Sequence, residues 1–153
     1  MVPLAVLTVF LDLIGFGIIL PLLPLYVDAM GGSAETVGLL FGCFAGTQFI
    51  ATPLLGRLSD RVGRRPVILV SLAGNALSMI GFALATKLLL LPVLFFSRII
   101  AGATAGNISA CNAAVSDVTS EQERARAMGK IGAGLNLGLI CGPIMASTLS
   151  AKG

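Results

Sequence analysis

Long apolar runs separated by short polar connections make up almost all of this chain. About twenty consecutive apolar residues are enough for a helix to cross a hydrocarbon core of about 30 Å. A backbone inside lipid must satisfy its own hydrogen bonds, so each such run is expected to be helical. The pattern predicts an all-α membrane protein with about five transmembrane helices, at residues 3–26, 36–57, 67–86, 88–113 and 129–149.

Composition agrees with this pattern and excludes several classes of protein. The 153 residues are 56% hydrophobic and 11% charged, with a mean hydropathy of +0.99, whereas a soluble domain carries about 25% charged residues. The absence of histidine excludes a histidine-based active site or metal site. Cys43, Cys111 and Cys141 all lie in apolar runs, where small buried thiols are expected rather than a disulfide or metal ligands. The basic residues occupy short loops without interleaved stacking residues, so we expect no nucleic-acid partner. We also expect no enzyme activity and no cofactor.

The one dense cluster of charge covers residues 56–66. Lipid does not solvate so many charges, so the cluster is predicted to be a tight turn in water between the second and third spans. Gly56 and Gly63 are expected to allow the turn geometry, and Pro66 suits the first position of the next helix. The candidate residues of this turn are Gly56, Asp60, Arg61, Gly63, Arg64 and Arg65.

Basic residues gather in alternate connections, which predicts an orientation. The loop from Asp28 to Glu35 contains two acids and no base, and on the same side only Lys87 and Lys152 are basic. Short basic loops stay in the cytoplasm, so the amino terminus is predicted to be cytoplasmic and the end of the chain to lie outside. The second and fourth connections hold the remaining loop bases, Arg57, Arg61, Arg64, Arg65, Arg124, Arg126 and Lys130.

Two charged residues lie inside apolar spans. Asp12 is about nine residues, or roughly 13 Å, from the start of the first span, and Arg98 is about ten residues, or roughly 15 Å, from the start of the fourth. The two are therefore predicted at similar depth, either as a structural ion pair or as a proton-titrated acid beside a cation. An intramembrane acid is a functional candidate by default, which favours the second interpretation. Gln48, near mid-membrane, and Asn112, on the small polar face of the fourth span, complete the candidate proton-coupling and substrate cavity.

Small residues recur every fourth position in two spans, which is typical of close helix contact in membranes. In the second span they are Gly38, Gly42 and Gly46, and the pattern predicts a packing seam there. The fifth span has the same spacing at Gly134, Gly138, Gly142 and Ala146, where Pro143 is expected to add a bend. Ser120 and Glu123 have the spacing of a capping box and predict that a helix restarts near them.

Four segments together resemble the major facilitator superfamily. The turn Gly56-Arg57-Leu58-Ser59-Asp60-Arg61-Val62-Gly63-Arg64-Arg65 matches the signature between its second and third helices. The segment from Gly138 to Ser147 is similar to the Gly-x-x-x-Gly-Pro-x-x-Gly-Gly signature of proton-coupled antiporters, with Ala146 and Ser147 in place of the last two glycines. The segment from Arg98 to Gly102 resembles the Arg-x-x-Gln-Gly signature of the fourth helix, with Ala101 in place of Gln. Residues 12–21 are similar to the first helix of the tetracycline and multidrug efflux branch.

The resemblance implies a fold and a mechanism. The family is built from two six-helix bundles that rock about a central site, and this chain would supply five helices of the first bundle, without the C-terminal bundle that is its partner. The acid at the position of Asp60 would help to hold the outward-open state through contacts with that second bundle. The implied activity is proton-coupled export of small amphipathic organic compounds across a lipid bilayer, with Asp12 as the proton-binding group. Two alternatives stay open: an uptake symporter or uniporter of the same fold, and a truncated membrane protein that does not transport.

Overall fold

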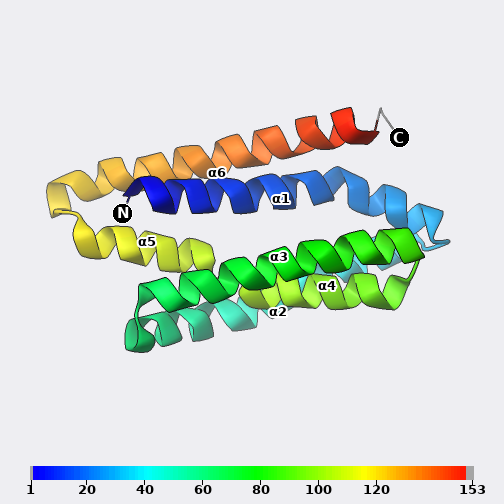
Figure 1. Cartoon of the computed structure of the whole chain (residues 1–153), viewed down its shortest axis with the longest axis horizontal. Helices are drawn as coiled ribbons and strands as arrows, with labels where there is room; N and C mark the ends of the chain where they lie inside the picture. Colours follow the sequence, from blue (N-terminus) through cyan, green and yellow to red (C-terminus); the bar gives the residue numbers. More distant parts are fainter. Residues whose placement is uncertain (1, 151–153) are drawn as a thin grey trace. The chain divides into compact units, whose positions relative to one another are not determined.

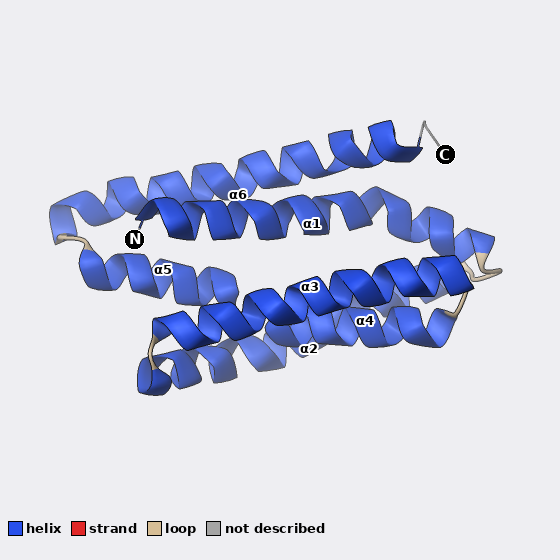
Figure 2. Ribbon diagram, in the orientation of Figure 1, coloured by secondary structure: helices blue, strands red, loops and turns tan. Residues whose placement is uncertain are grey.

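The computed structural model describes residues 2–150 of the chain, and every element in this part is an α-helix (Figures 1 and 2). Five segments are long and apolar enough to cross a membrane, which confirms the predicted number of spans. The protein is therefore an integral, multi-pass membrane protein. The helices are α1 (Val2–Ala29), α2 (Ala34–Val62), α3 (Arg64–Leu88), α4 (Leu91–Thr104), α5 (Asn107–Val118) and α6 (Glu121–Ser150).

The fourth predicted span is two helices rather than one. The regular α-helical hydrogen bonding stops after Thr104. The N–H of Ala105 donates to the carbonyl of Gly102, three residues back rather than four, at a distance of 3.3 Å. Gly102 and Gly106 flank the break, and glycine has a low helix propensity. The predicted continuous helix over 88–113 is therefore wrong in this detail, although Leu91–Val118 still has the length and hydropathy of a single span.

Helix ends follow local sequence signals. Ser33 caps α2: its Oγ accepts from the Thr36 N–H at 3.4 Å, and its own N–H donates to the Thr36 hydroxyl at 3.3 Å. The predicted restart of a helix after Ser120 is confirmed, because α6 begins at Glu121 and Ser120 Oγ lies 3.3 Å from a Glu123 carboxylate oxygen. The Ser33–Thr36 pair satisfies amide groups that the first helical turn leaves without partners.

The described chain divides into two compact units, and the first combines residues 1–22 with residues 108–153. Within it α1 and α6 run in the same direction, as expected for the first and fifth of successive spans that each reverse the chain (Figure 1). Gly134 packs against Val6, and Gly142 packs against Gly17. The small residues at four-residue spacing in the fifth span therefore mark a close helix contact, and the partner is α1.

The second unit covers residues 23–107 and contains α2, α3 and α4, packed against one another. Small residues again mark the closest approaches. A Cβ added at Gly81 of α3 would stand 3.2 Å from Ser97 Cβ of α4, and one added at Gly102 would stand 3.0 Å from Thr47 Cβ of α2. Because helices touch so closely only where side chains are absent or small, these glycines determine how α4 sits against its two neighbours.

The glycine stripe in the second span does not behave as predicted. Within the second unit, no atom lies within 4 Å of the place where a Cβ would stand at Gly38, Gly42 or Gly46. The predicted packing seam is therefore not formed inside this unit. The spacing is the same as in α6, but α4 packs against a different face of α2, at Thr47.

Apolar side chains cover much of the outside of both units. Phe49 is 82% exposed and Phe96 is 68% exposed. A soluble protein of this size does not leave so many large apolar side chains in water, whereas lipid tails solvate them. The exposure therefore agrees with the membrane location derived from the hydropathy pattern.

Candidate functional site

The basic turn between α2 and α3 is shorter than the sequence predicts. Helix α2 continues to Val62, so Gly56 lies inside this helix and its assignment as a turn residue is wrong. Gly63 alone makes the turn, with φ of +96° and ψ of 159°, a backbone conformation that is essentially restricted to glycine. Pro66 is the third residue of α3 rather than the first, a position where the backbone N–H still has no partner inside the helix.

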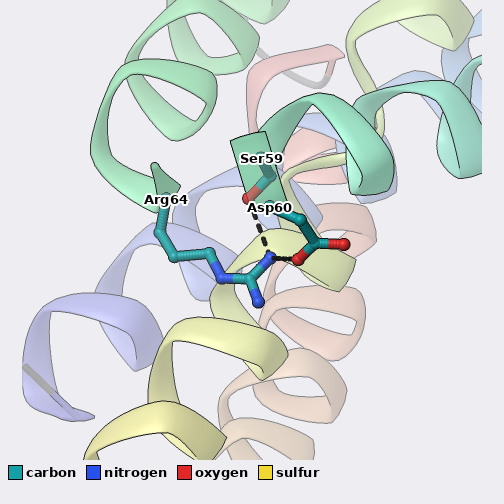
Figure 3. A network of polar contacts seen from close by, with 3 residues as sticks. All are labelled: Ser59, Asp60 and Arg64. Carbon is teal, nitrogen blue, oxygen red and sulfur yellow. Dashed lines mark hydrogen bonds and ion pairs between the residues drawn. The ribbon is translucent and has the colours of Figure 1, made fainter. Parts of the chain in front are cut away.

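A polar network ties the two sides of this turn together (Figure 3). Arg64 Nη1 lies 2.5 Å from Asp60 Oδ1, and it also donates to Ser59 Oγ at 3.1 Å. Ser59 and Asp60 end α2 and Arg64 begins α3, so the guanidinium bridges the break at Gly63. Arg61 and Arg65 are exposed.

The exposure of this network indicates what it does. The Asp60 side chain is 61% exposed and that of Arg64 is 25% exposed. An ion pair that reaches solvent contributes only about 0–1 kcal/mol to stability, because water screens it. The pair therefore fixes the geometry of the turn more than it stabilises the helices, and breaking it frees both charges for other partners.

The intramembrane arginine is buried on α4 and lies against an aromatic ring. Arg98 is 3% exposed, and its guanidinium carbon stands 5.3 Å from the centroid of the Phe82 ring on α3. Tyr26, near the end of α1, meets the same ring edge-on, with centroids 5.9 Å apart and an angle of 81°. Within the second unit, no hydrogen-bond acceptor reaches Arg98 Nε or Nη2, both of which are buried.

The other predicted cavity residues lie on three different helices. Asp12 is half-buried on α1, within electrostatic range of Cys111 on α5, and Asn112 follows that cysteine. Gln48 is half-buried on α2, where it lines a groove of about 740 Å³ together with Phe49, Pro53 and Arg57. Asp12 and Asn112 belong to the first unit, and Gln48 and Arg98 belong to the second. The pairing of Asp12 with Arg98 therefore stays a prediction.

The residues of the fifth-span signature form the contact between α6 and α1. A Cβ added at Gly138 would stand 2.7 Å from the Phe10 carbonyl oxygen, and one added at Gly142 would stand 2.6 Å from Gly17 Cα. A Cβ added at Gly17 would stand 3.2 Å from Pro143 Cδ. Helix α6 continues through Pro143 to Ser150, so the signature brings two backbones together on the helix that carries Asp12.

Sequence reasoning missed three residues that the structure places in these sites. Ser59 lies five residues before Arg64, and this spacing alone does not indicate that the two side chains meet across the turn. Phe82 and Tyr26 are ordinary apolar-span residues in the sequence, and nothing in their spacing indicates a contact with Arg98. Only the packing of α3 against α4 brings the ring and the guanidinium together.

Comparison with known proteins gives the family of the chain. A model of the Major Facilitator Superfamily matches residues 5–153. The chain belongs to the major facilitator superfamily. Its fold is therefore the transmembrane helical fold of these transporters, and the resemblance drawn from the sequence motifs is confirmed.

Relatives within the superfamily are named for drug resistance. The tetracycline resistance protein of class E from Escherichia coli is 40% identical over 147 residues, which are 94% of this chain and 36% of that protein. The class H protein from Pasteurella multocida is 40% identical over 142 residues, 91% of this chain and 35% of that protein. Multidrug resistance protein 2 of Bacillus subtilis (strain 168) is 38% identical over 136 residues, 88% of this chain and 33% of that protein. The chain thus spans about a third of the length of these relatives.

Proposed function

We propose that this chain is the N-terminal part of a proton-coupled exporter of small amphipathic organic compounds that works by alternating access. The observation that carries the proposal is the presence of two ionisable side chains inside spanning helices, Asp12 on α1 and the buried Arg98 on α4. Charges at such depth are expensive, and they mark ion or substrate pathways in membrane proteins. Relatives named for tetracycline and multidrug resistance support export of organic compounds.

The proposed cycle uses a change in the charge of Asp12. The carboxyl group takes up a proton from outside, the two bundles rock, and the proton leaves on the cytoplasmic side, where the amino terminus is placed in this proposal. Coupling requires that the two conformations prefer different charge states of Asp12, since a ligand shifts an equilibrium only through its differential affinity for the two states. Substrate then moves in the opposite phase of the cycle. Arg98, Gln48 and Asn112 provide the polar groups of the proposed cavity.

The turn between α2 and α3 acts as a conformational latch in this proposal. In one state Arg64 holds Asp60 within its own turn, as observed. In the other state Asp60 contacts the C-terminal bundle, which lies beyond the part of the transporter that this chain represents. Because the observed pair is exposed and weak, exchanging it for a contact with the second bundle requires little free energy.

The test uses the full-length transporter that contains this chain, reconstituted in vesicles with a pH gradient. For one-to-one exchange, a gradient of one pH unit sustains about a tenfold gradient of substrate. The Asp12→Asn variant keeps the shape of the side chain and loses the titratable group. The ratio of tetracycline or ethidium concentrations on the two sides of the membrane should therefore fall to about one, while exchange down a substrate gradient continues. Asp28→Asn, which removes an exposed acid at the outer end of α1, is the matched control and should keep gradient-driven export.

Other outcomes of this test point to other functions. Full gradient-driven export by the Asp12→Asn variant contradicts the coupling role. Accumulation of substrate together with protons by the unmodified protein would indicate a symporter of the same fold. Absence of any flux with a correctly inserted protein would indicate a membrane protein that does not transport.

A further inference from the structure

We infer that Phe82 is a positioning residue for Arg98: its ring holds the guanidinium in place inside the second unit and leaves two of its donor atoms for an acceptor group of the substrate. This inference rests on the proposed function. It begins with the packing of α3 on α4. Gly81 and Ser97 form one close approach of these helices, and each immediately precedes one of the two residues in question.

The ring is buried and has an aromatic neighbour. Phe82 is 8% exposed, and the Tyr26 ring lies nearly perpendicular to it, with centroids 5.9 Å apart and an angle of 81°. The hydroxyl of Ser97 donates to the Leu94 carbonyl at 2.7 Å, within its own helix. Burial and the contact with Tyr26 therefore restrict the position of the ring.

The contact itself has the geometry of a cation–π interaction. A guanidinium within about 6 Å of a ring centroid is attracted by the negative face of the ring, and desolvation strengthens the attraction. At 5.3 Å, in a buried place, Phe82 partly compensates the loss of water around Arg98 without offering a hydrogen-bond acceptor. An ion pair would occupy the N–H groups, whereas an aromatic ring leaves them available.

The free donors indicate the chemistry of what binds there. Arg98 Nε and Nη2 are buried, and no acceptor of the second unit reaches them. A buried donor without an acceptor is costly, and the cost disappears when an oxygen acceptor arrives. A ligand oxygen that binds to these two nitrogens would make a charge-assisted contact with a group already held in position. The loss of Phe82 should then weaken substrate binding more than turnover.

The experiment replaces Phe82 by phenylalanines with one, two and three ring fluorines in the full-length transporter. Fluorine keeps the ring and nearly its size but removes negative potential from its face, so each added fluorine should raise KM for export, by about 2-fold to 30-fold over the series, with kcat little changed. The probe is tetracycline or ethidium, whichever the unmodified protein exports. The same fluorinated residues at Phe96, which is 68% exposed on the helix of Arg98, are the matched control and should change nothing.

Three further variants separate the possible failures. Phe82→Trp should retain low KM and Phe82→Leu should not, although both keep an apolar side chain. Arg98→Lys tests the site independently: if it leaves export unchanged, the proposed role of Arg98 fails, and with it the inference. If Arg98→Lys impairs export while the fluorine series is flat in KM at equal protein level, Phe82 only fills space and the inference alone is overturned.

Discussion

Adding one methyl group at Gly142 should push α6 away from α1. A Cβ on residue 142 would stand 2.6 Å from both Cα and the carbonyl carbon of Gly17 and 2.9 Å from the Ile14 carbonyl oxygen. All three neighbours are backbone atoms, so no side-chain rotation relieves the clash. The two helices must separate by roughly 1 Å to restore an ordinary carbon–carbon spacing of about 3.5–4.0 Å.

The expected magnitude follows from the nature of the clash. Inserting a methyl group into a closely packed contact costs about 1–3 kcal/mol. A second effect acts in the opposite direction, because replacing glycine by alanine in a helix is favourable by about 1 kcal/mol. Gly132→Ala is the matched control: residue 132 is in the same helix, and no described atom lies within 4 Å of its added Cβ. Since both variants share the propensity effect, their difference isolates the clash.

The assay is reversible unfolding in mixed detergent micelles, followed by circular dichroism. Gly142→Ala should have a free energy of unfolding lower than that of Gly132→Ala by about 1–3 kcal/mol. The same variant should also transport less, because the displaced helix α1 carries Asp12. Equal stability of the two variants would refute the conclusion that this glycine is required for close backbone contact.

Three further predictions concern the turn and the topology. The topology can be tested in a chain whose native cysteines are replaced by serine. There Val62→Cys, at a position 55% exposed, should react only with reagents on the cytoplasmic side, and Ala34→Cys only with reagents outside. Reaction of both from one side would overturn the orientation. Asp60→Asn should shift stability by less than about 1 kcal/mol yet reduce transport in the full-length protein, and a variant that transports normally would contradict the latch. Gly63→Ala should destabilise the protein by about 1–3 kcal/mol, since φ of +96° suits only glycine, whereas Gly56→Ala inside α2 should not. Similar melting temperatures of the two variants would show that the turn adapts.

Most of the architecture could be predicted from the sequence because membranes impose a simple rule. A helix that crosses lipid needs about twenty apolar residues, so the hydropathy pattern alone locates the five spans. Local signals also held at the turn glycine Gly63 and at the start of α6 after Ser120, because caps and turns depend on neighbours in the chain. The family followed from fixed residue identities in the signatures.

Contacts between helices were decided by the tertiary structure. The stripes through Gly42 and Gly138 have the same four-residue spacing, yet only the second meets a neighbouring backbone within its own unit. Spacing shows that a helix has a flat face, but it does not show whether another helix lies against that face. The end of α2 was also not visible in the sequence. Gly56 was predicted to lie in the turn, but it is part of α2, because this helix continues beyond the apolar run.

The candidate site divides in the same way. Sequence alone identifies Asp12 and Arg98, because a charge in an apolar span is conspicuous and costly. It does not identify Phe82, because one more apolar residue in an apolar span carries no signal of its own. Only the packing of α3 on α4 places that ring 5.3 Å from the guanidinium carbon, since the contact joins residues on separate helices whose register is set by small residues at their closest approach.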